Sequence, residues 1–433
     1  MRLSTANLFD SSIANLQRRQ IAMQDQQQQL TSGKRVALAS DDPTGAARAE
    51  RALASIGRVD ANQRALEASR NSMTLAESAL GDANELLQQA RETLVAAGNA
   101  SYSDAERKSL ATKLQGIRDE LLAISNRSDG AGGYVFSGQG SSSPPFLDQA
   151  NGVAYVGVPG TIDTGNLDSF QLTVDGRAAW EQAVGGNGSF ETAPRAIVID
   201  PVSGRPTVQL IDPVATAGNG GVPVPIVNAL TGLPAAGWID SGRVTEPTLL
   251  TGHDYRVDIA GTAPAQTYTL TDQTLGSVVA SGAFKPGQAI GGDGMAFAIS
   301  GVPVDGDAFA ITGARPDTKL FSVIDKAIVD LNTTLRTPVQ VTQGNTLAIR
   351  DVDAVMGNLQ SMRSQVGERL NNLDGTEGRL AALKQYSEQE RSAAEDLDMV
   401  QGISDFQSQQ SGYDTALRTY AMVQRMSLFE YLR

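Results

Sequence analysis

The chain has 433 residues, enough for two to four domains, and is 41% hydrophobic, 19% charged and only 5% aromatic. Its net charge is -13, with 35 Lys and Arg against 48 Asp and Glu, and no basic cluster that would bind phosphates, so we do not expect nucleic acid as a partner. Cysteine is absent and His253 is the single histidine, which excludes disulfides, thiolate metal sites and most histidine-based chemistry. We therefore predict no catalytic residue, no cofactor and no metal site, and we do not expect an enzyme.

The sequence predicts neither a membrane-spanning segment nor a secretory signal peptide. The sequence holds no run of about 20 apolar residues, the length needed to cross a bilayer. Its first thirty residues are polar and rich in glutamine, without the continuous apolar stretch of a secretory signal peptide. We expect no membrane insertion, and either a cytoplasmic protein or one exported without such a signal.

The first segment, up to about residue 32, predicts a helix with one narrow apolar stripe. The stripe recurs at steps of four and three residues, which is the spacing of a coiled-coil seam. Its members are Phe9, Ile13, Leu16, Gln20, Met23, Gln27 and Leu30. Because the two glutamines weaken the stripe, this helix needs an apolar partner from elsewhere.

A helix break follows at Gly33, before residues 40–43. In that tetrapeptide, Ser40-Asp41-Asp42-Pro43, either aspartate can cap a new helix with the proline in its first turn, where a missing N–H does no harm. Two adjacent aspartates could also serve a metal or acid–base site. The cap is the better interpretation, because it accounts for the proline as well.

The next helix carries the strongest pattern in the chain. Large and small side chains alternate at strict heptad spacing, so leucine side chains of one helix can fit over alanines of another. The series is Leu66, Ser69, Met73, Ala76, Leu80, Ala83, Leu87, Ala90, Leu94 and Ala97. A capping box at 103–106 then predicts a further helix, which we expect to reach Gly130.

The composition changes near residue 136, where prolines and glycines accumulate until about residue 315. Alternating segments at 170–174, 255–259, 268–270 and 296–299 predict strands, with a turn at Asp175-Gly176. We expect two small β units, at about 146–190 and 246–314. The proline- and glycine-rich stretch at 191–245 is predicted to be a loop or an irregular insertion.

Helical patterns return from about residue 316, and the last segment repeats the stripe of the first: Ile403, Phe406, Gln410, Tyr413, Leu417, Tyr420 and Gln424. If the two stripes pair, both ends of the chain lie together. The predicted fold class is α+β, with a coiled-coil and bundle stalk built from both termini and an inserted β-rich module. The predicted domains are residues 1–40 with 398–433, residues 41–140 with 315–397, and residues 141–314.

Several short segments resemble the flagellin superfamily. They lie at both ends of the chain and at both domain junctions: residues 30–35, 40–43, 133–138, 306–309, 320–321 and 427–432. The Ser-Asp-Asp-Pro form is more similar to the hook-associated members, the hook–filament junction proteins, than to filament flagellins. Residues 191–245 match no part of this family.

The resemblance implies a secreted structural subunit of the extracellular bacterial flagellum, exported by the flagellar type III apparatus and assembled as a ring. The implied partners are flagellin, a hook-side hook-associated protein, further copies of the chain and an export chaperone. The terminal stripes and the tail are the expected assembly interface: Phe9, Ile13, Leu16, Met23, Leu30, Ile403, Phe406, Tyr413, Leu417, Tyr420, Leu428, Phe429 and Tyr431. A filament flagellin and a stalked surface adhesin remain the alternatives.

Overall fold

The computed structural model describes residues 4–99, 101–150, 152–165, 168–199, 206–210, 237–334 and 338–431. It contains long helices and several antiparallel sheets, which confirms the predicted α+β fold class. The chain forms two compact units. The terminal unit consists of residues 1–66, 165–168 and 374–433, and the central unit of residues 67–164 and 169–373. The predicted domain boundaries stay predictions.

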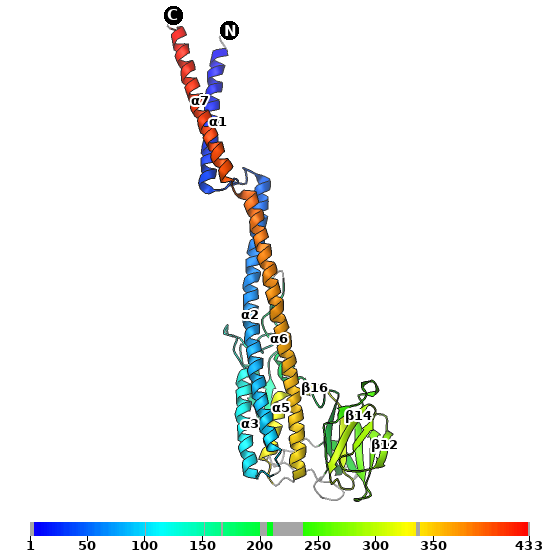
Figure 1. Cartoon of the computed structure of the whole chain (residues 1–433). Coiled ribbons are helices and arrows are strands. Elements are labelled where there is room, and N and C mark those ends of the chain that lie inside the picture. The colour runs from blue at the N-terminus through cyan, green and yellow to red at the C-terminus, as the bar shows by residue number, and fades with distance from the viewer. Residues whose placement is uncertain are drawn as a thin grey trace. The chain divides into compact units, whose positions relative to one another are not determined.

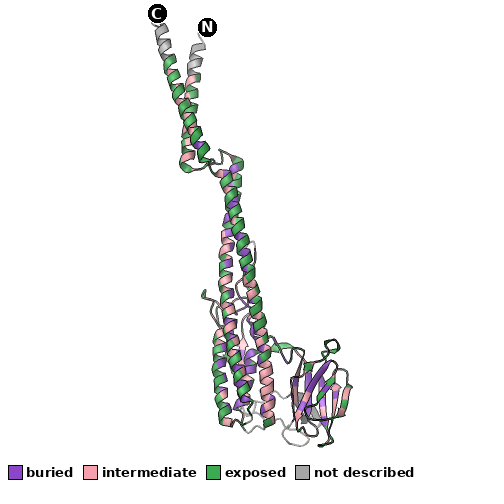
Figure 2. Ribbon diagram, viewed as in Figure 1, coloured by how far each residue is buried: buried purple, intermediate pink, exposed green. Residues whose placement is uncertain are grey.

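In the terminal unit, helices α1 (Ser4–Ser32) and α7 (Met399–Tyr431) lie side by side and antiparallel, so both chain ends are at the same end of the pair (Figure 1). Two glycines of α7 allow a close approach. A Cβ on Gly402 would be 3.2 Å from Leu30 Cδ2, and one on Gly412 would be 2.7 Å from Arg19 Nη1. No described side chain from residue 11 to residue 32 is buried, and both helices are largely green in Figure 2.

Helices α2 (Pro43–Ala97) and α6 (Pro338–Glu395) contribute to both units and run antiparallel. In the terminal unit Lys384 Nζ lies 2.8 Å from Asp60 Oδ1, and Ser387 Oγ lies 3.0 Å from Ser55 Oγ. In the central unit Arg363 bonds Glu77 at 2.8 Å. Because the residue number falls on one helix as it rises on the other, these contacts fix one antiparallel register.

The central part of α2 buries the predicted leucine–alanine series. Met73, Leu80, Leu87 and Leu94 are each at most 2% exposed, and the alanines between them are fully buried.

Helix α3 (Asp104–Ser125) begins at the predicted capping box, in which the side chain of Ser103 accepts from the N–H of Glu106. It ends at Ser125 and not at Gly130, because Asn126 already caps it and bonds the main chain of Phe146 at 2.8 Å.

After the β region the chain becomes helical again at helix α5 (Leu320–Asn332). Ion pairs and aromatic packing hold this helix in place. Arg118 of α3 is 7% exposed and binds both carboxylate oxygens of Asp148, at 2.7 and 2.8 Å, and Asp325 of α5 at 2.5 Å. Burial is the main reason that the pKa of Asp325 is raised, and Arg118 opposes that shift. Nearby, Trp180 packs against Phe136 and stacks on Phe321, at ring distances of 5.4 and 6.2 Å.

The β region before residue 190 is made of short pieces, and one sequence prediction about it is wrong. The segment 170–174 contains only a two-residue strand, and Asp175 begins helix α4 (Gly176–Glu181) by accepting from the N–H groups of Arg177 and Ala178. The turn expected at Asp175-Gly176 is therefore a helix cap. The strands here are β1 (Phe146–Gln149), β2 (Gly152–Tyr155), β3 (Asp163–Thr164), β4 (Phe170–Gln171) and β5 (Ala183–Val184).

The later β region is a sandwich of two antiparallel sheets. One has the strand order β12-β11-β10-β15-β6-β7 and the other β13-β14-β8, with β9 beside β14. Their inner faces share a core that includes Tyr255, Val257, Phe297, Ile299 and Phe309, seen as the purple strands of Figure 2. The bounds are β6 (Phe190–Ile199), β7 (Pro206–Leu210), β8 (Gly237–Ile239), β9 (Arg243–Val244), β10 (Tyr255–Ala260), β11 (Thr267–Asp272), β12 (Ser277–Ala283), β13 (Ala289–Gly292), β14 (Met295–Gly301) and β15 (Ala308–Gly313); β16 (Pro316–Thr318) pairs with β5.

The sandwich corrects the expectation for residues 191–245. Four strands, β6 to β9, lie in this stretch apart from the first residue of β6, and Ile239 belongs to the core. Their partners are distant in sequence: β6 pairs with β15, and β8 with β14. The local pattern of prolines and glycines cannot reveal strands whose partners lie far along the chain, as Ile239 pairs with Ile299 and Ala193 with Ala310. Residues 211–236 lie outside the described residues.

Replacing Leu87 by alanine tests the core of the helical bundle. Leu87 is 1% exposed, so the substitution should remove about 2–5 kcal/mol from the free energy of unfolding, the usual cost of a buried cavity. Urea unfolding followed by circular dichroism measures this. The matched control is Val95→Ala on the same helix, 54% exposed, which should change stability by less than about 0.5 kcal/mol; equal effects would contradict the assignment of Leu87 to the core.

Candidate assembly surface and helix joint

Among the described residues there is no group of three or more His, Cys, Asp or Glu side chains that could hold a metal ion. None of the helices in the described ranges has the length and apolarity to cross a membrane. His253 is paired with Asp272, with 2.7 Å between Nδ1 and Oδ2. Burial tends to raise the pKa of Asp272, but hydrogen bonds from His253 and from two backbone N–H groups outweigh it and lower that pKa.

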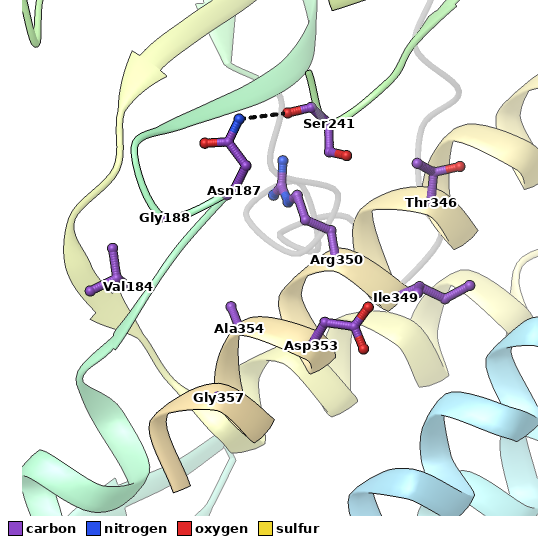
Figure 3. A pocket seen from close by; sticks show the side chains of 11 residues that line it. Val184, Asn187, Gly188, Ser241, Thr346, Ile349, Arg350, Asp353, Ala354 and Gly357 are labelled. Carbon is purple, nitrogen blue, oxygen red and sulfur yellow. Dashed lines mark hydrogen bonds between the residues drawn. The ribbon is translucent and has the colours of Figure 1, made fainter. Parts of the chain in front are cut away.

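The central unit contains a cleft of about 550 Å³ between α6 and the β5–β6 loop (Figure 3). Its charged lining residues already have partners, since Arg350 pairs with Asp351 and Asp353 with Arg91. The rest of the lining is apolar or neutral, with Val184 and Ile349 as its larger apolar side chains. The cleft therefore presents no charged group poised for chemistry.

The joint between the two helix pairs of the terminal unit is built from two chain breaks that lie side by side. Residues 33–42 lie between α1 and α2, and residues 396–398 lie between α6, which ends at Glu395, and α7. Lys34 and Asp396 form an antiparallel β-bridge. The N–H groups of Arg35 and Val36 donate to Glu395 O at 2.7 and 3.3 Å, and that of Leu397 donates to Gly33 O at 2.9 Å. A short piece of sheet thus ties both breaks together.

Asp42 is the residue that caps α2. Its Oδ1 accepts from the N–H of Thr44 at 3.1 Å and from that of Gly45 at 2.9 Å, and Pro43 is the first residue of the helix. These bonds satisfy N–H groups that have no partner within a helix. Arg35 joins the cap to the joint, because it binds Asp42 at 3.2 Å and donates to Ala394 O at 2.9 Å.

Asp41 and Ser40 serve the turn before the helix. The carboxylate of Asp41 accepts from the N–H groups of Ala37 and Leu38, at 3.1 and 2.8 Å. The Ser40 hydroxyl lies 3.4 Å from Asp41 Oδ1 and is not part of the cap. The two adjacent aspartates therefore have separate structural roles, which the sequence left open.

The pKa of Asp42 is lowered to about 2. The hydrogen bond from the Gly45 N–H is the largest cause, followed by the one from the Thr44 side chain, with Arg35 adding to them. Each of these favours the charged form. The carboxylate stays ionised well below the pH at which an ordinary aspartate takes up a proton.

The predicted interface residues of α1 and α7 divide into two rows. Those at least partly covered by the partner helix are Leu16, Met23, Leu30, Phe406, Tyr413 and Tyr420. The others are more exposed: Ile13, Ile403 and Leu417 keep 40%, 47% and 40% of their surface accessible. Phe9, Leu428, Phe429 and Tyr431 lie within the helices, but their side chains are outside the described part of the structure.

The structure also contains interface candidates that the sequence reading missed. Ile21, Val400 and Met422 are 57%, 81% and 65% exposed. Gly402, Gln409 and Ala416 occupy the seam of α7 in place of Ile403, Gln410 and Leu417. These three are small or polar, so an apolar pattern passes over them. The spacing of seven residues from Gly402 was the available signal.

The cap predicts a specific acid sensitivity. The folded-state pKa of Asp42 lies below the ordinary value of 3.8, so its stabilisation is present above pH 3.8 and is lost as the pH falls through about 2. Asp42→Ala should therefore lower the thermal midpoint at neutral pH, and the gap to the unmodified protein should shrink between pH 3.8 and 2. Asp25→Ala, an exposed aspartate of α1, serves as the control and should leave no such gap. A gap that stays constant down to pH 2 would contradict the cap.

The chain is similar in sequence to known flagellar proteins. Residues 3–141 match the bacterial flagellin N-terminal helical region. Flagellar hook-associated protein 3 of Salmonella typhimurium is 36% identical over 178 residues, which are 41% of this chain and 55% of that protein. The protein of the same name from Escherichia coli is 33% identical over 165 residues, or 36% of this chain and 49% of that one. The chain thus spans about half the length of the curated relatives it matches.

Solved structures extend the similarity to the fold. FlgL from Xanthomonas campestris has a TM-score of 0.61 and 25% identity, with 78% of this chain and 98% of that chain covered. A hook-associated protein 3 from Legionella pneumophila has a TM-score of 0.65 and 23% identity, with 78% and 97% covered. The resemblance to hook-associated proteins of the flagellin superfamily is thus confirmed, since the chain carries the flagellin N-terminal helical region and shares the fold of the flagellar junction proteins named FlgL.

Proposed function

We propose that this chain is a structural subunit of the bacterial flagellum that forms a ring between a hook-side hook-associated protein and the flagellin filament. Its role is packing and not catalysis, and it acts outside the cell. Similarity to proteins named flagellar hook-associated protein 3 supports the proposal at the level of sequence. The observation that carries it is the second apolar row of the terminal helix pair, which a single copy leaves uncovered.

The first row is used within the chain. Leu30 lies against Gly402, and Arg19 lies over Gly412, so α1 and α7 hold each other along one face. This contact buries little surface: among the residues of α7 whose burial is described, only Gly402 is buried. Such a pair stabilises one copy only weakly.

The second row is left for neighbours. Ile403 and Leu417 are 14 positions apart, which is two heptads, and each keeps about half of its surface in water. Full burial of a side chain of this size is worth about 1.5–3 kcal/mol relative to full exposure. Several half-exposed side chains per copy, repeated round a ring, would stabilise an assembly that one chain cannot form. Neighbouring copies therefore pack their terminal helices against one another, and the monomer stays exportable.

The two kinds of partner follow from the axial position. A ring subunit presents one face to the hook-side protein and the other to flagellin, and an export chaperone would cover the apolar row before assembly. A filament flagellin is the second candidate, because the matched N-terminal region is the one named for flagellins. Purified chain that polymerises alone into long filaments would favour that candidate over the junction ring.

Charged substitutions in the second row should block assembly without unfolding the chain. In Ile403→Asp with Leu417→Asp, two half-exposed apolar side chains become carboxylates, so incorporation into flagella and swimming should be lost in a strain that lacks the native gene. The matched control is Ser408→Asp, also exposed on α7 but on a different face of the helix from Ile403 and Leu417, which should swim normally. Circular dichroism of the purified variants should show unchanged helix content. Full motility of the double variant would refute the role of this row.

Removing residues 420–433 tests the same interface by shortening helix α7. The truncation takes away Tyr420 and the C-terminal end of α7, and it leaves every residue of the sandwich core in place. We expect hooks without filaments and flagellin released into the medium, seen by electron microscopy and immunoblotting. Near-ultraviolet circular dichroism should report an intact β region. Normal filaments on this truncated chain would contradict the proposal.

A further inference from the structure

Three polar side chains of α6 hold main-chain atoms of the β-rich part of the central unit. Gln343, Arg350 and Asn358 are spaced by seven and eight residues, so they lie along one stripe of the helix. Gln343 binds Ile239, Arg350 binds Thr192, and Asn358 donates to Ala178 O and Ala179 O at 2.9 and 2.8 Å. All of the partner atoms are backbone N–H or C=O groups.

Gln343 takes the place that a neighbouring strand would have beside β8. Its Oε1 accepts from the N–H of Ile239 at 2.8 Å, and its Nε2 donates to Ile239 O at 3.2 Å. These groups point away from β14, because it is the next N–H along, that of Asp240, which bonds to β14 at Ala298 O. Gln343 is 6% exposed and Ile239 fully buried, so water does not compete for these bonds.

Arg350 reaches the other sheet. Its Nη1 donates to Thr192 O in β6 at 2.8 Å, and its charge is balanced by Asp351, whose Oδ1 accepts from Nε at 2.8 Å. The Thr192 hydroxyl in turn donates to Asp240 O at 2.6 Å, directly after β8. One helix thus holds one strand from each sheet, and two points of attachment on different sheets limit rotation about either one.

The space between these bonds is not filled by packing. The cleft of about 550 Å³ lies along the same stretch of α6, between Thr346, Ile349 and Ala354 on the helix and Asn187 and Ser241 opposite (Figure 3). Asn187 donates to Ser241 O and so holds its own side of the cleft together. With an open cleft between α6 and these loops, side-chain packing alone leaves room for the sandwich to tilt.

We propose that Gln343 and Arg350 form a mount that fixes the direction of the β-sandwich on helix α6. The mount binds only main-chain atoms, so it specifies the position of β6 and β8 without specifying their side chains. A β region of different sequence could then be held in the same direction, provided that it offers the same two backbone positions. This role is independent of what the flagellar partners are.

The chain has no cysteine, which allows a direct distance measurement. Spin labels on cysteines introduced at Val95 in α2 and Val278 in β12, both exposed, report the placement of the sandwich within the central unit. Double electron–electron resonance should give one narrow distribution of the distance between the two labels in the chain without further substitutions. Gln343→Ala should widen it at least twofold, and adding Arg350→Ala should widen it further. Gln360→Ala, an exposed glutamine of the same helix, should leave it unchanged.

Amide exchange separates loss of the mount from loss of the fold. In Gln343→Ala the N–H of Ile239 should exchange at least tenfold faster, while that of Asp240, bonded within the sandwich, stays protected. If Gln343→Ala unfolds the sandwich, Gln343→Glu replaces it in the test. The glutamate keeps an acceptor for the N–H of Ile239 and removes the donor to Ile239 O. Its distance distribution should be wider than that of the unmodified labelled chain and narrower than that expected for Gln343→Ala. A distribution as narrow as that of the unmodified labelled chain, in a folded variant, overturns the proposal.

Discussion

The antiparallel pairing of α2 with α6 is the contact on which the rest of the structure depends. Leu87 and its heptad neighbours are buried on a helix of 55 residues, and α6, which contacts α2 through Arg91–Asp353 and Glu77–Arg363, comes from the other side of the β region in the sequence. Ion pairs such as Glu77–Arg363 and Asp60–Lys384 then choose one register. Surface pairs of this kind add little free energy, so they select the register while the apolar seam supplies the stability.

From that register follow the positions of the other parts. Because α2 and α6 run in opposite directions, the chain breaks next to them, at Gly33 and at Asp396, come within hydrogen-bonding distance. In the central unit the chain leaves and re-enters the helical bundle near Phe136 and Phe321, and both rings pack on Trp180. Residues that are far apart in sequence thus meet within each unit, and local hydrogen bonds, ion pairs and ring contacts then hold them.

Much of the helical part could be predicted because its signals are local. Heptad spacing located the buried face of α2, and the pair Ser103 and Glu106 located the start of α3. Asp42 could be named as one of two possible caps, but the choice between Asp41 and Asp42 depends on backbone geometry that the sequence does not state. The β region was harder, since the first half of β6 pairs with β15 and β8 pairs with β14, and both partners are distant in sequence.

The expected assembly interface was one stripe on each helix, and in the structure of one chain the described residues of these stripes divide into a partly covered row and an exposed row. A spacing of three and four identifies a face but not its width, so it could not separate Leu30, which lies against Gly402, from Ile13, which is more exposed. Gln343 is harder still to foresee. A glutamine on a helix is ordinary in sequence, and its role comes from Ile239, a residue 104 positions away.

The β-bridge between Lys34 and Asp396 has a mechanical consequence. Two independent linkers would let α1 and α7 swing separately, and each could meet a neighbour at its own angle. Here the linkers share hydrogen bonds, so bending one displaces the other. Helices α1 and α7 therefore change direction together, because their linkers cannot bend independently.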